Sequence, residues 1–246
     1  MRIAIVSDIH GNLPALEAVV ADFCRRGVDA VVNLGDSLSG PLLPRETAQF
    51  LMAQDWTHLA GNHERQILDT SVPQSASDLY ARSCLSPLEF DWLRSLAPRA
   101  DYADDVLLCH GTPDSDLHYL METVEPGTFR LASAAELDAR LGGTAAALIV
   151  CGHSHLPRSL RTARGQLVVN PGSVGVPGYS AHAPHPHVVQ NGSPDARYAI
   201  VERRDGRWQS SLHAVPYDFR PMAALAAQRG RAEWAHVLST GYVGQA

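Results

Sequence analysis

The sequence lacks the features that mark a secreted or membrane-spanning protein. Its 246 residues include only four cysteines, which stand far apart and form no Cys-x-x-Cys pair, so neither a thiolate zinc site nor a thioredoxin-like motif is indicated. No apolar run has the length of a transmembrane helix, and the apolar run at the N-terminus is too short for a signal peptide. We therefore expect a cytoplasmic protein with no membrane partner.

Basic residues are also too few for a broad nucleic-acid-binding face. Lys and Arg number 20 against 26 for Asp and Glu, which gives a formal net charge of −6 at pH 7. Proteins that hold a phosphate backbone normally gather basic side chains on one face. The composition therefore argues against a nucleic-acid partner, although a local basic patch would escape this test.

The first third of the chain repeats a strand, a polar tip and a helix. Apolar runs at residues 2–6, 30–34 and 56–60 predict strands, and helical apolar patterns follow the first two. Strands of successive βα units run parallel in one sheet, so their polar tips should meet at its carboxyl edge. In open α/β sheets, that edge binds ligands.

A helical pattern replaces the strands after the third polar tip. We expect a helical insert at about residues 65–96, near the site, within one domain that spans residues 1–246. Strand patterns return at residues 105–109 and 147–151, and each is followed by another polar tip.

The C-terminal third has a different pattern. After Pro157, shorter strands alternate with Gly and Pro turns, which predicts a second, more antiparallel sheet. A loop rich in Gly, Pro and His interrupts these strands at residues 172–195, and a helical tail begins at about residue 218.

All five strand tips offer side chains that can bind a metal ion. The mixture of carboxylate, carboxamide and imidazole suits manganese, iron or zinc better than magnesium or calcium, which favour oxygen ligands. Two divalent ions roughly 3.5–4 Å apart, with one carboxylate between them, would use the set and favour in-line displacement at phosphorus. The tip residues are Asp8, His10, Asp36, Asn62, His63, His110, His153 and His155.

These tips form short motifs in a defined order. They are Asp8-x-His10, Gly35-Asp36, Gly61-Asn62-His63-Glu64, His110-Gly111 and Gly152-His153-x-His155. In this order they resemble the calcineurin-like metallophosphoesterase superfamily, and in particular its small bacterial phosphodiesterase-like branch. The resemblance implies an α/β fold, a four-layer αββα sandwich of two mixed β-sheets flanked by helices.

The resemblance also implies a dinuclear mechanism. A hydroxide that bridges two divalent transition-metal ions would attack phosphorus, and His63 would be the general acid that protonates the leaving alkoxide. The implied ligands are Asp8, His10 and His155 for the first ion, Asn62, His110 and His153 for the second, and Asp36 as the bridge.

Two departures from related phosphatases narrow the expected substrate. Protein serine/threonine phosphatases carry one arginine shortly after Gly-Asp and another directly before Gly-Asn-His. In this sequence the corresponding positions are Gly40 and Ala60, so both arginines are missing. We therefore expect a small-molecule phosphodiester as substrate. Arg65 is a candidate phosphate contact or, equally, a surface helix residue, and Glu64 is a candidate support for the metal ligands.

Other functions stay open at this stage. The same site would serve a phosphomonoesterase, and some superfamily members resemble the enzymes but act as non-catalytic metal-stabilised scaffolds. The loop from His182 to His187 could bind an accessory metal ion or substrate, although a Pro-broken surface loop is the commoner case. Nothing in the sequence indicates an oligomeric state.

Overall fold

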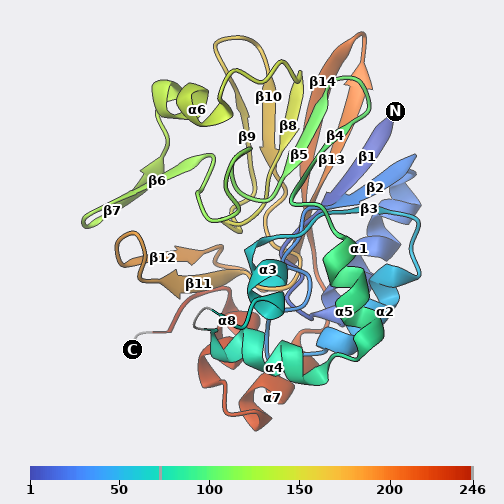
Figure 1. The fold of residues 1–246 in the computed structure, drawn as a ribbon, viewed down its shortest axis with the longest axis vertical. Coiled ribbons are helices and arrows are strands. Elements are labelled where there is room, and N and C mark those ends of the chain that lie inside the picture. The colour runs from blue at the N-terminus through green and yellow to red at the C-terminus, as the bar shows by residue number, and fades with distance from the viewer. Residues whose placement is uncertain (72–73, 245–246) are drawn as a thin grey trace.

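The structure, a computed structural model, describes residues 1–71 and 74–244. Two five-stranded mixed sheets face each other, and helices cover their outer sides (Figure 1). The prediction of a four-layer αββα sandwich is therefore confirmed.

The first sheet carries the first three polar tips. Its strands, in order, are β14 (Arg207–Val215), β13 (Ala196–Arg204), β1 (Arg2–Val6), β2 (Ala30–Asn33) and β3 (Thr57–His58). The central strand β1 pairs in parallel with β2, and β2 pairs in parallel with β3, as expected of successive βα units. On its other side β1 pairs antiparallel with β13.

The second sheet carries the other two polar tips. Its strands, in order, are β4 (Arg99–Tyr102), β5 (Val106–Cys109), β8 (Leu148–Val150), β10 (Leu167–Asn170) and β9 (Arg158–Arg161). The three central strands are parallel, and both edge strands are antiparallel to their neighbours. The two tips of this sheet therefore also lie at a common edge.

Side chains of β1 alternate between the two faces of the first sheet. Ile5 joins a buried cluster with Leu108 and Val150 of the second sheet, so it fills the space between the sheets. Ala4 instead packs in a cluster with α1 (Leu13–Arg26) on the outer face. The core thus joins both sheets before any polar tip is placed.

The outer helices begin at the caps that the sequence indicates. Asn12 Oδ1 accepts a hydrogen bond from Ala15 N at 3.3 Å and so caps α1. α2 (Pro44–Met52) packs against the same face of the first sheet. α6 (Ala134–Leu141) begins after the capping box at Ser133 and covers the outer face of the second sheet.

Three helices lie between β3 and β4, near the strand tips. They are α3 (Asn62–Leu68), α4 (Ala76–Cys84) and α5 (Pro87–Ser95), and they pack around a small buried cluster that includes Leu38 and Ile67. Residues 72–73, which fall within the predicted insert, lie outside the described residues.

Two further helices follow β14, namely α7 (Arg220–Gln228) and α8 (Ala232–Thr240), and they pack on Leu42. Both lie within the helical tail predicted from about residue 218. A single domain, with its insert and C-terminal tail, stays a prediction, which the pairing of β13 with β1 supports. In the part of the chain that the structure describes, no helix combines the length and the apolar character needed to cross a bilayer.

The prediction of a separate sheet after Pro157 is wrong. β9 and β10 join the sheet of β5 and β8, whereas β13 and β14 complete the sheet of β1. The local pattern identified these strands correctly, but sheet membership depends on pairing between distant segments, which a local pattern does not encode.

Two hairpins also lie outside the predicted elements. β6 (Glu122–Glu125) pairs with β7 (Thr128–Leu131), and β11 (Gly178–Ala181) pairs with β12 (His187–Gln190) inside the predicted loop. The hairpins project to the same side of the molecule, beside α3 and α8 (Figure 1). They flank the strand tips and so help to shape the site.

Candidate metal centre

The strand tips hold their side chains in an unusual backbone conformation. Among the described residues, seven that are not glycine have a positive φ, and five of these are tip residues. The left-handed conformation costs roughly 1–2 kcal/mol for such residues, so the strain is concentrated at the candidate site. The five are Asp8 (φ 56°), His10 (51°), Asp36 (54°), His153 (65°) and His155 (57°).

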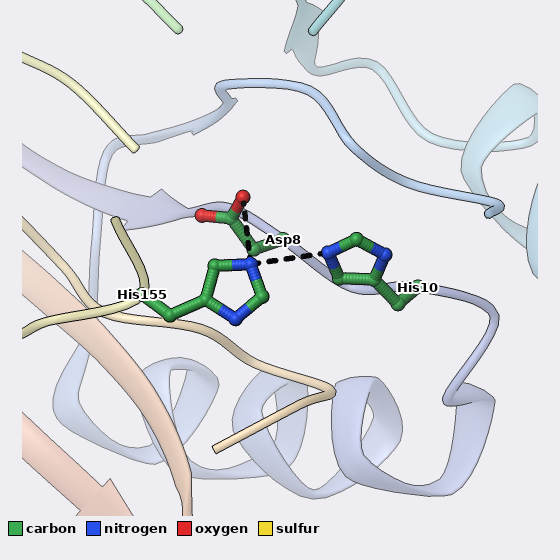
Figure 2. A group of neighbouring side chains, drawn as sticks. All are labelled: Asp8, His10 and His155. Atoms are coloured by element: carbon green, nitrogen blue, oxygen red, sulfur yellow. Dashed lines mark hydrogen bonds and ion pairs between the residues drawn. The ribbon is translucent and has the colours of Figure 1, made fainter. Parts of the chain in front are cut away.

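One group of ligand atoms gathers around Asp8 at the end of β1 (Figure 2). His155 Nε2 lies 3.4 Å from Asp8 Oδ1 and 3.2 Å from His10 Nε2. All three side chains are buried, and their ligand atoms lie within 4.8 Å of one another. Two imidazole nitrogens and a carboxylate oxygen thus converge on a volume that suits one divalent ion.

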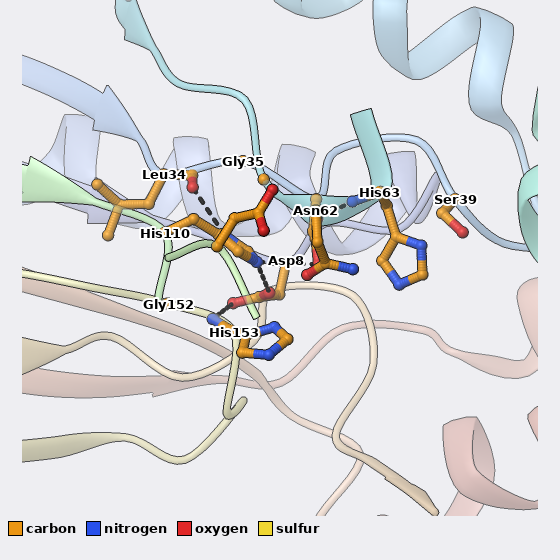
Figure 3. A network of polar contacts seen from close by, with 12 residues as sticks. Asp8, Leu34, Gly35, Ser39, Asn62, His63, His110, Gly152 and His153 are labelled. Atoms are coloured by element: carbon orange, nitrogen blue, oxygen red, sulfur yellow. Dashed lines mark hydrogen bonds and ion pairs between the residues drawn. The ribbon is translucent and has the colours of Figure 1, made fainter. Parts of the chain in front are cut away.

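A second group gathers around Asp36, at the tip that follows β2 (Figure 3). His110 Nε2 lies 3.0 Å from Asp36 Oδ2, and a nitrogen of His153 completes a set within 4.8 Å. The two groups adjoin, because His110 Nε2 is only 4.0 Å from Asp8 Oδ1 of the first group. The resemblance divides the same four histidines between the two ions, and the full ligand sets, with Asn62 and a bridging Asp36, stay a prediction.

Two buried oxygens at the strand tips, Asp8 Oδ1 and Asn62 Oδ1, have no hydrogen-bond partner among the described residues. His110 Nε2 instead forms an ion pair with Asp36 Oδ2 at 3.0 Å. A buried polar atom without a partner costs about 1–3 kcal/mol, so the two oxygens call for a further bound group. All three atoms are ordinary ligand atoms for divalent transition metals, so the residues present fit two such ions.

One ring nitrogen of each ligand histidine contacts a backbone carbonyl, and this contact determines which nitrogen faces the centre. A backbone carbonyl can only accept, so the ring nitrogen that contacts it must carry the proton. His10, His110 and His155 use Nδ1 in this way, which leaves Nε2 for a metal, whereas His153 donates from Nε2 to Leu117 O at 3.0 Å and leaves Nδ1. The three Nδ1 partners are the carbonyls of Ser39, Leu34 and Val176, at 2.7, 2.9 and 2.8 Å.

Electrostatics keep two of these histidines neutral and one protonated. Burial and the neighbouring His155 lower the pKa of His10 to about 4, and burial and His110 lower the pKa of His153 to about 4. Burial also opposes the charge on His110, but the Asp36 carboxylate outweighs it and raises that pKa to about 10. A divalent ion bound here would replace the proton of His110, so metal binding should release a proton.

Glu64 holds two of the motifs together. It is fully buried, and its carboxylate accepts three backbone hydrogen bonds of 2.7 Å, from the N–H groups of Asp36, Ser37 and Gly61. Gly61 must be glycine, because a Cβ there would lie 2.3 Å from Asp36 Oδ1. The structure places Glu64 behind the ligands, as a support for the second and third tips.

The turn that follows β10 supports the first tip in the same way. Ser173 Oγ donates to Asp8 O at 2.7 Å, and Gly175 N donates to the same carbonyl at 3.1 Å. Asn170 Nδ2 donates to Gly152 O at 2.6 Å and so holds the loop that carries His153. None of these side chains belongs to the two ligand groups.

His63 lies beside both groups but belongs to neither (Figure 3). Its side chain is 24% exposed, and its Nδ1 donates to Asp78 Oδ1 at 2.7 Å. Burial alone would lower the pKa of His63, but the carboxylates of Asp36 and Asp78 together outweigh this effect and raise the pKa to about 9. Its free Nε2–H can therefore serve as a proton donor at neutral pH.

Asp78 is a candidate functional residue that the sequence did not reveal. It lies on α4 and also accepts hydrogen bonds from Ser39 Oγ at 2.8 Å and from Ser75 Oγ at 2.6 Å. The pattern Ser75-x-x-Asp78 indicates a capping box, and this was the one local signal that could have drawn attention to it. Its contact with His63 depends on the packing of α4 against α3.

Replacing Asp78 with asparagine should lower kcat about tenfold and shift its pH profile. His63 must be protonated to act as an acid, and loss of the Asp78 charge lowers its pKa. The fall of kcat at high pH should therefore begin at a lower pH than in the wild type. Ser75→Ala weakens the same capping box but keeps the carboxylate, so its kcat should begin to fall at the same pH as in the wild type. If kcat of Asp78→Asn also begins to fall at the wild-type pH, the assignment is contradicted.

Arg65 is already engaged by another side chain. Its guanidinium donates to both carboxylate oxygens of Asp116, at 2.7 and 2.8 Å. This bidentate pair joins α3 to the loop after β5, and an arginine so held is less available to a substrate phosphate. A role for Arg65 in phosphate binding stays a prediction.

The histidine-rich loop lies at the turn between β11 and β12. His187 Nε2 forms a 2.9 Å hydrogen bond with the hydroxyl of Tyr119, and the His187 ring stacks on Phe129 of β7, with ring centroids 5.3 Å apart. It therefore joins the two hairpins. Within the described residues, none of the histidines from His182 to His187 belongs to a group that could hold a metal ion.

Comparison with known proteins identifies the family. Residues 1–189 match the model of the calcineurin-like phosphoesterase superfamily domain. The chain is 24% identical to an uncharacterized protein of Methanocaldococcus jannaschii, with 94% of both chains covered. It is also 29% identical to the phosphodiesterase YfcE of Escherichia coli K12, over 72% of this chain and 81% of the relative.

Solved structures show the same fold over the whole chain. A metallophosphoesterase from Sphaerobacter thermophilus superposes with a TM-score of 0.76 at 25% identity, covering 98% of this chain and 99% of the other. A hypothetical protein from Pyrococcus horikoshii OT3 gives the same TM-score at 17% identity, with 99% of both chains covered. The predicted resemblance is confirmed, and the chain belongs to the calcineurin-like phosphoesterase superfamily.

Proposed function

We propose that the protein hydrolyses a small-molecule phosphodiester with two divalent transition-metal ions, and that His63 protonates the leaving alkoxide. One observation carries the proposal: two ligand groups adjoin, the buried oxygens Asp8 Oδ1 and Asn62 Oδ1 have no hydrogen-bond partner among the described residues, and a non-ligand histidine held by a carboxylate lies beside them. Membership of a phosphoesterase family and similarity to a protein named a phosphodiesterase support it.

The donor set favours manganese, iron or zinc, because imidazole nitrogens accompany the oxygen ligands. When bound, two such ions supply a hydroxide nucleophile at neutral pH and neutralise the charge of the phosphoryl oxygens. Asp8, His10 and His155 would hold one ion, and Asn62, His110 and His153 the other. Asp36 belongs to the second group and its charge acts on His10 of the first, so we propose that it contributes to both.

The remaining roles belong to side chains that bind no metal. His63 would deliver the proton of Nε2 to the leaving oxygen, while Asp78 keeps the ring oriented and protonated. Glu64 would hold the backbone of the second and third tips in place during turnover. We also propose a cytoplasmic location, which this mechanism does not require.

The test is hydrolysis by the purified protein loaded with manganese. We expect it to cleave bis(p-nitrophenyl) phosphate faster than p-nitrophenyl phosphate, with about two metal ions per chain by elemental analysis. Faster cleavage of the monoester would indicate a phosphatase instead. Hydrolysis of neither ester by the metal-loaded protein would overturn the proposal.

A further inference from the structure

Two hollows share Tyr179 of β11 as a lining residue, and their volumes are about 670 Å³ for the first and about 750 Å³ for the second. The ring of Tyr179 lies 4.8 Å from the ring of His155, so this shared wall is next to the first ligand group.

The first hollow lies on the side of the proton donor. Both His63 and His153 line it, together with side chains of the β6–β7 and β11–β12 hairpins. A general acid must lie within hydrogen-bond reach of the oxygen that it protonates. The leaving group of a bound ester would therefore occupy this hollow.

The second hollow is lined mainly by residues of β11 and α8. Trp234 of α8 forms one wall, and its ring centroid is 6.2 Å from that of His10. Gly40 allows this approach, because a Cβ there would lie 2.8 Å from Trp234 Cη2. Neither His63 nor His153 lines the second hollow, so a group bound there would not be the one protonated.

The chemistry of the second hollow favours an uncharged, planar group. Trp234 is half-buried and lines the hollow, and the guanidinium carbon of Arg231 lies 5.7 Å from the centroid of its ring. Arg231, the arginine that lines this hollow, donates to Glu233 Oε1 at 2.6 Å and to Ser77 Oγ at 3.2 Å. Its charge is therefore already paired, which makes the hollow poorly suited to a second phosphate or a carboxylate.

We infer that the second hollow receives the ester arm that remains on phosphorus, as an aromatic or other planar group stacked on Trp234. The inference rests on the proposed function and narrows its substrate to phosphodiesters with two substantial organic arms. In an in-line displacement the leaving arm lies opposite the incoming water oxygen. The retained arm must therefore lie away from this line, and it needs a binding space separate from that of the leaving arm. Water gives one proton to solvent and its oxygen forms a P–O bond, while the P–O bond to the leaving arm breaks and its electron pair stays on the leaving oxygen. That oxygen takes the proton of His63, and His63 then regains a proton from solvent.

The test varies only the retained arm. Methyl p-nitrophenyl phosphate and bis(p-nitrophenyl) phosphate share a leaving group, and the ratio of their kcat/KM values, compared between variants, cancels their intrinsic reactivities. In the manganese-loaded protein, Trp234→Ala should lower the ratio of kcat/KM for the aryl ester to kcat/KM for the methyl ester about tenfold, which is the effect expected from the loss of one aromatic contact. Trp234→Phe should lower this ratio less. Ala232→Trp, at the exposed rim of the same hollow, should also lower the ratio by filling the space.

Tyr242→Ala is the matched control, because Tyr242 is an exposed aromatic of the same C-terminal segment that does not line the hollow. Its ratio should equal that of the wild type. The inference would be overturned if both Trp234→Ala and Ala232→Trp left the ratio unchanged, whether the two rates stayed the same or fell equally. If the wild type cleaves neither ester, the proposed function itself fails, which is a separate outcome.

Discussion

Asp36→Asn should lose most of the bound metal and at least about 100-fold of the metal affinity. Asp36 Oδ2 lies 3.0 Å from His110 Nε2, and its charge also acts on His10 of the other group. A neutral amide of the same shape removes the carboxylate that we propose as the bridge between the two ions. Because the proposed mechanism uses both ions, turnover at limiting manganese should fall by at least the same factor.

The fold should survive this replacement. The asparagine Oδ1 can still accept the hydrogen bond that His63 N donates to Asp36 Oδ1 at 2.9 Å. Thermal unfolding and elemental analysis on the same sample separate loss of metal from loss of structure.

Asp105→Asn is the control for this prediction, because Asp105 lies at the opposite end of β5 from His110 and contacts Trp208 and Arg203. Its metal content should match that of the wild type. Two ions retained in Asp36→Asn at wild-type affinity would remove Asp36 from the metal centre.

His63→Ala should leave both metal ions bound and slow the hydrolysis of alkyl esters by about 10²–10⁴-fold. An alkoxide is a poor leaving group and needs the proton of His63, whereas p-nitrophenolate leaves without one. The loss on bis(p-nitrophenyl) phosphate should therefore be much smaller than the loss on a dialkyl ester. This dependence on the leaving group is the signature of a lost general acid.

His182→Ala provides the matched control, since it removes an exposed histidine at the tip of a neighbouring hairpin. It should retain wild-type rates on both esters. An equal loss on both esters in His63→Ala, or a fall in its metal content, would mean that His63 acts through binding or through the ligands rather than as an acid.

Much of the site could be predicted because it depends on local sequence. Asp8 and His110 come just after short apolar strands, and within each sheet the parallel strands bring such tips to one edge whatever the loops do. The motifs then separated ligands from the acid. Asp78 escaped prediction because its contact with His63 depends on how α4 packs on α3. Locally it has only the pattern of a helix cap.

Sheet membership and the two hairpins were beyond the same reasoning. Strand β13 has a clear strand pattern, but nothing near it in the sequence indicates that Ile200 will lie opposite Ala4. The hairpin of β11 and β12 contains Gly, Pro and His, a composition typical of loops. Tyr179 and Trp234 were therefore not singled out, although they line the hollows next to the metal centre.

The pairing of β1 with β13 has a consequence for biosynthesis. β1 and β2 are made in close succession, but the neighbour on the other side of β1 spans Ala196–Arg204. Until that segment emerges from the ribosome, the cluster between the sheets lacks Ala199 and Val201, and the strand that presents Asp8 has one open edge. The sheet that supports the candidate metal centre is thus completed only after β13 has been made.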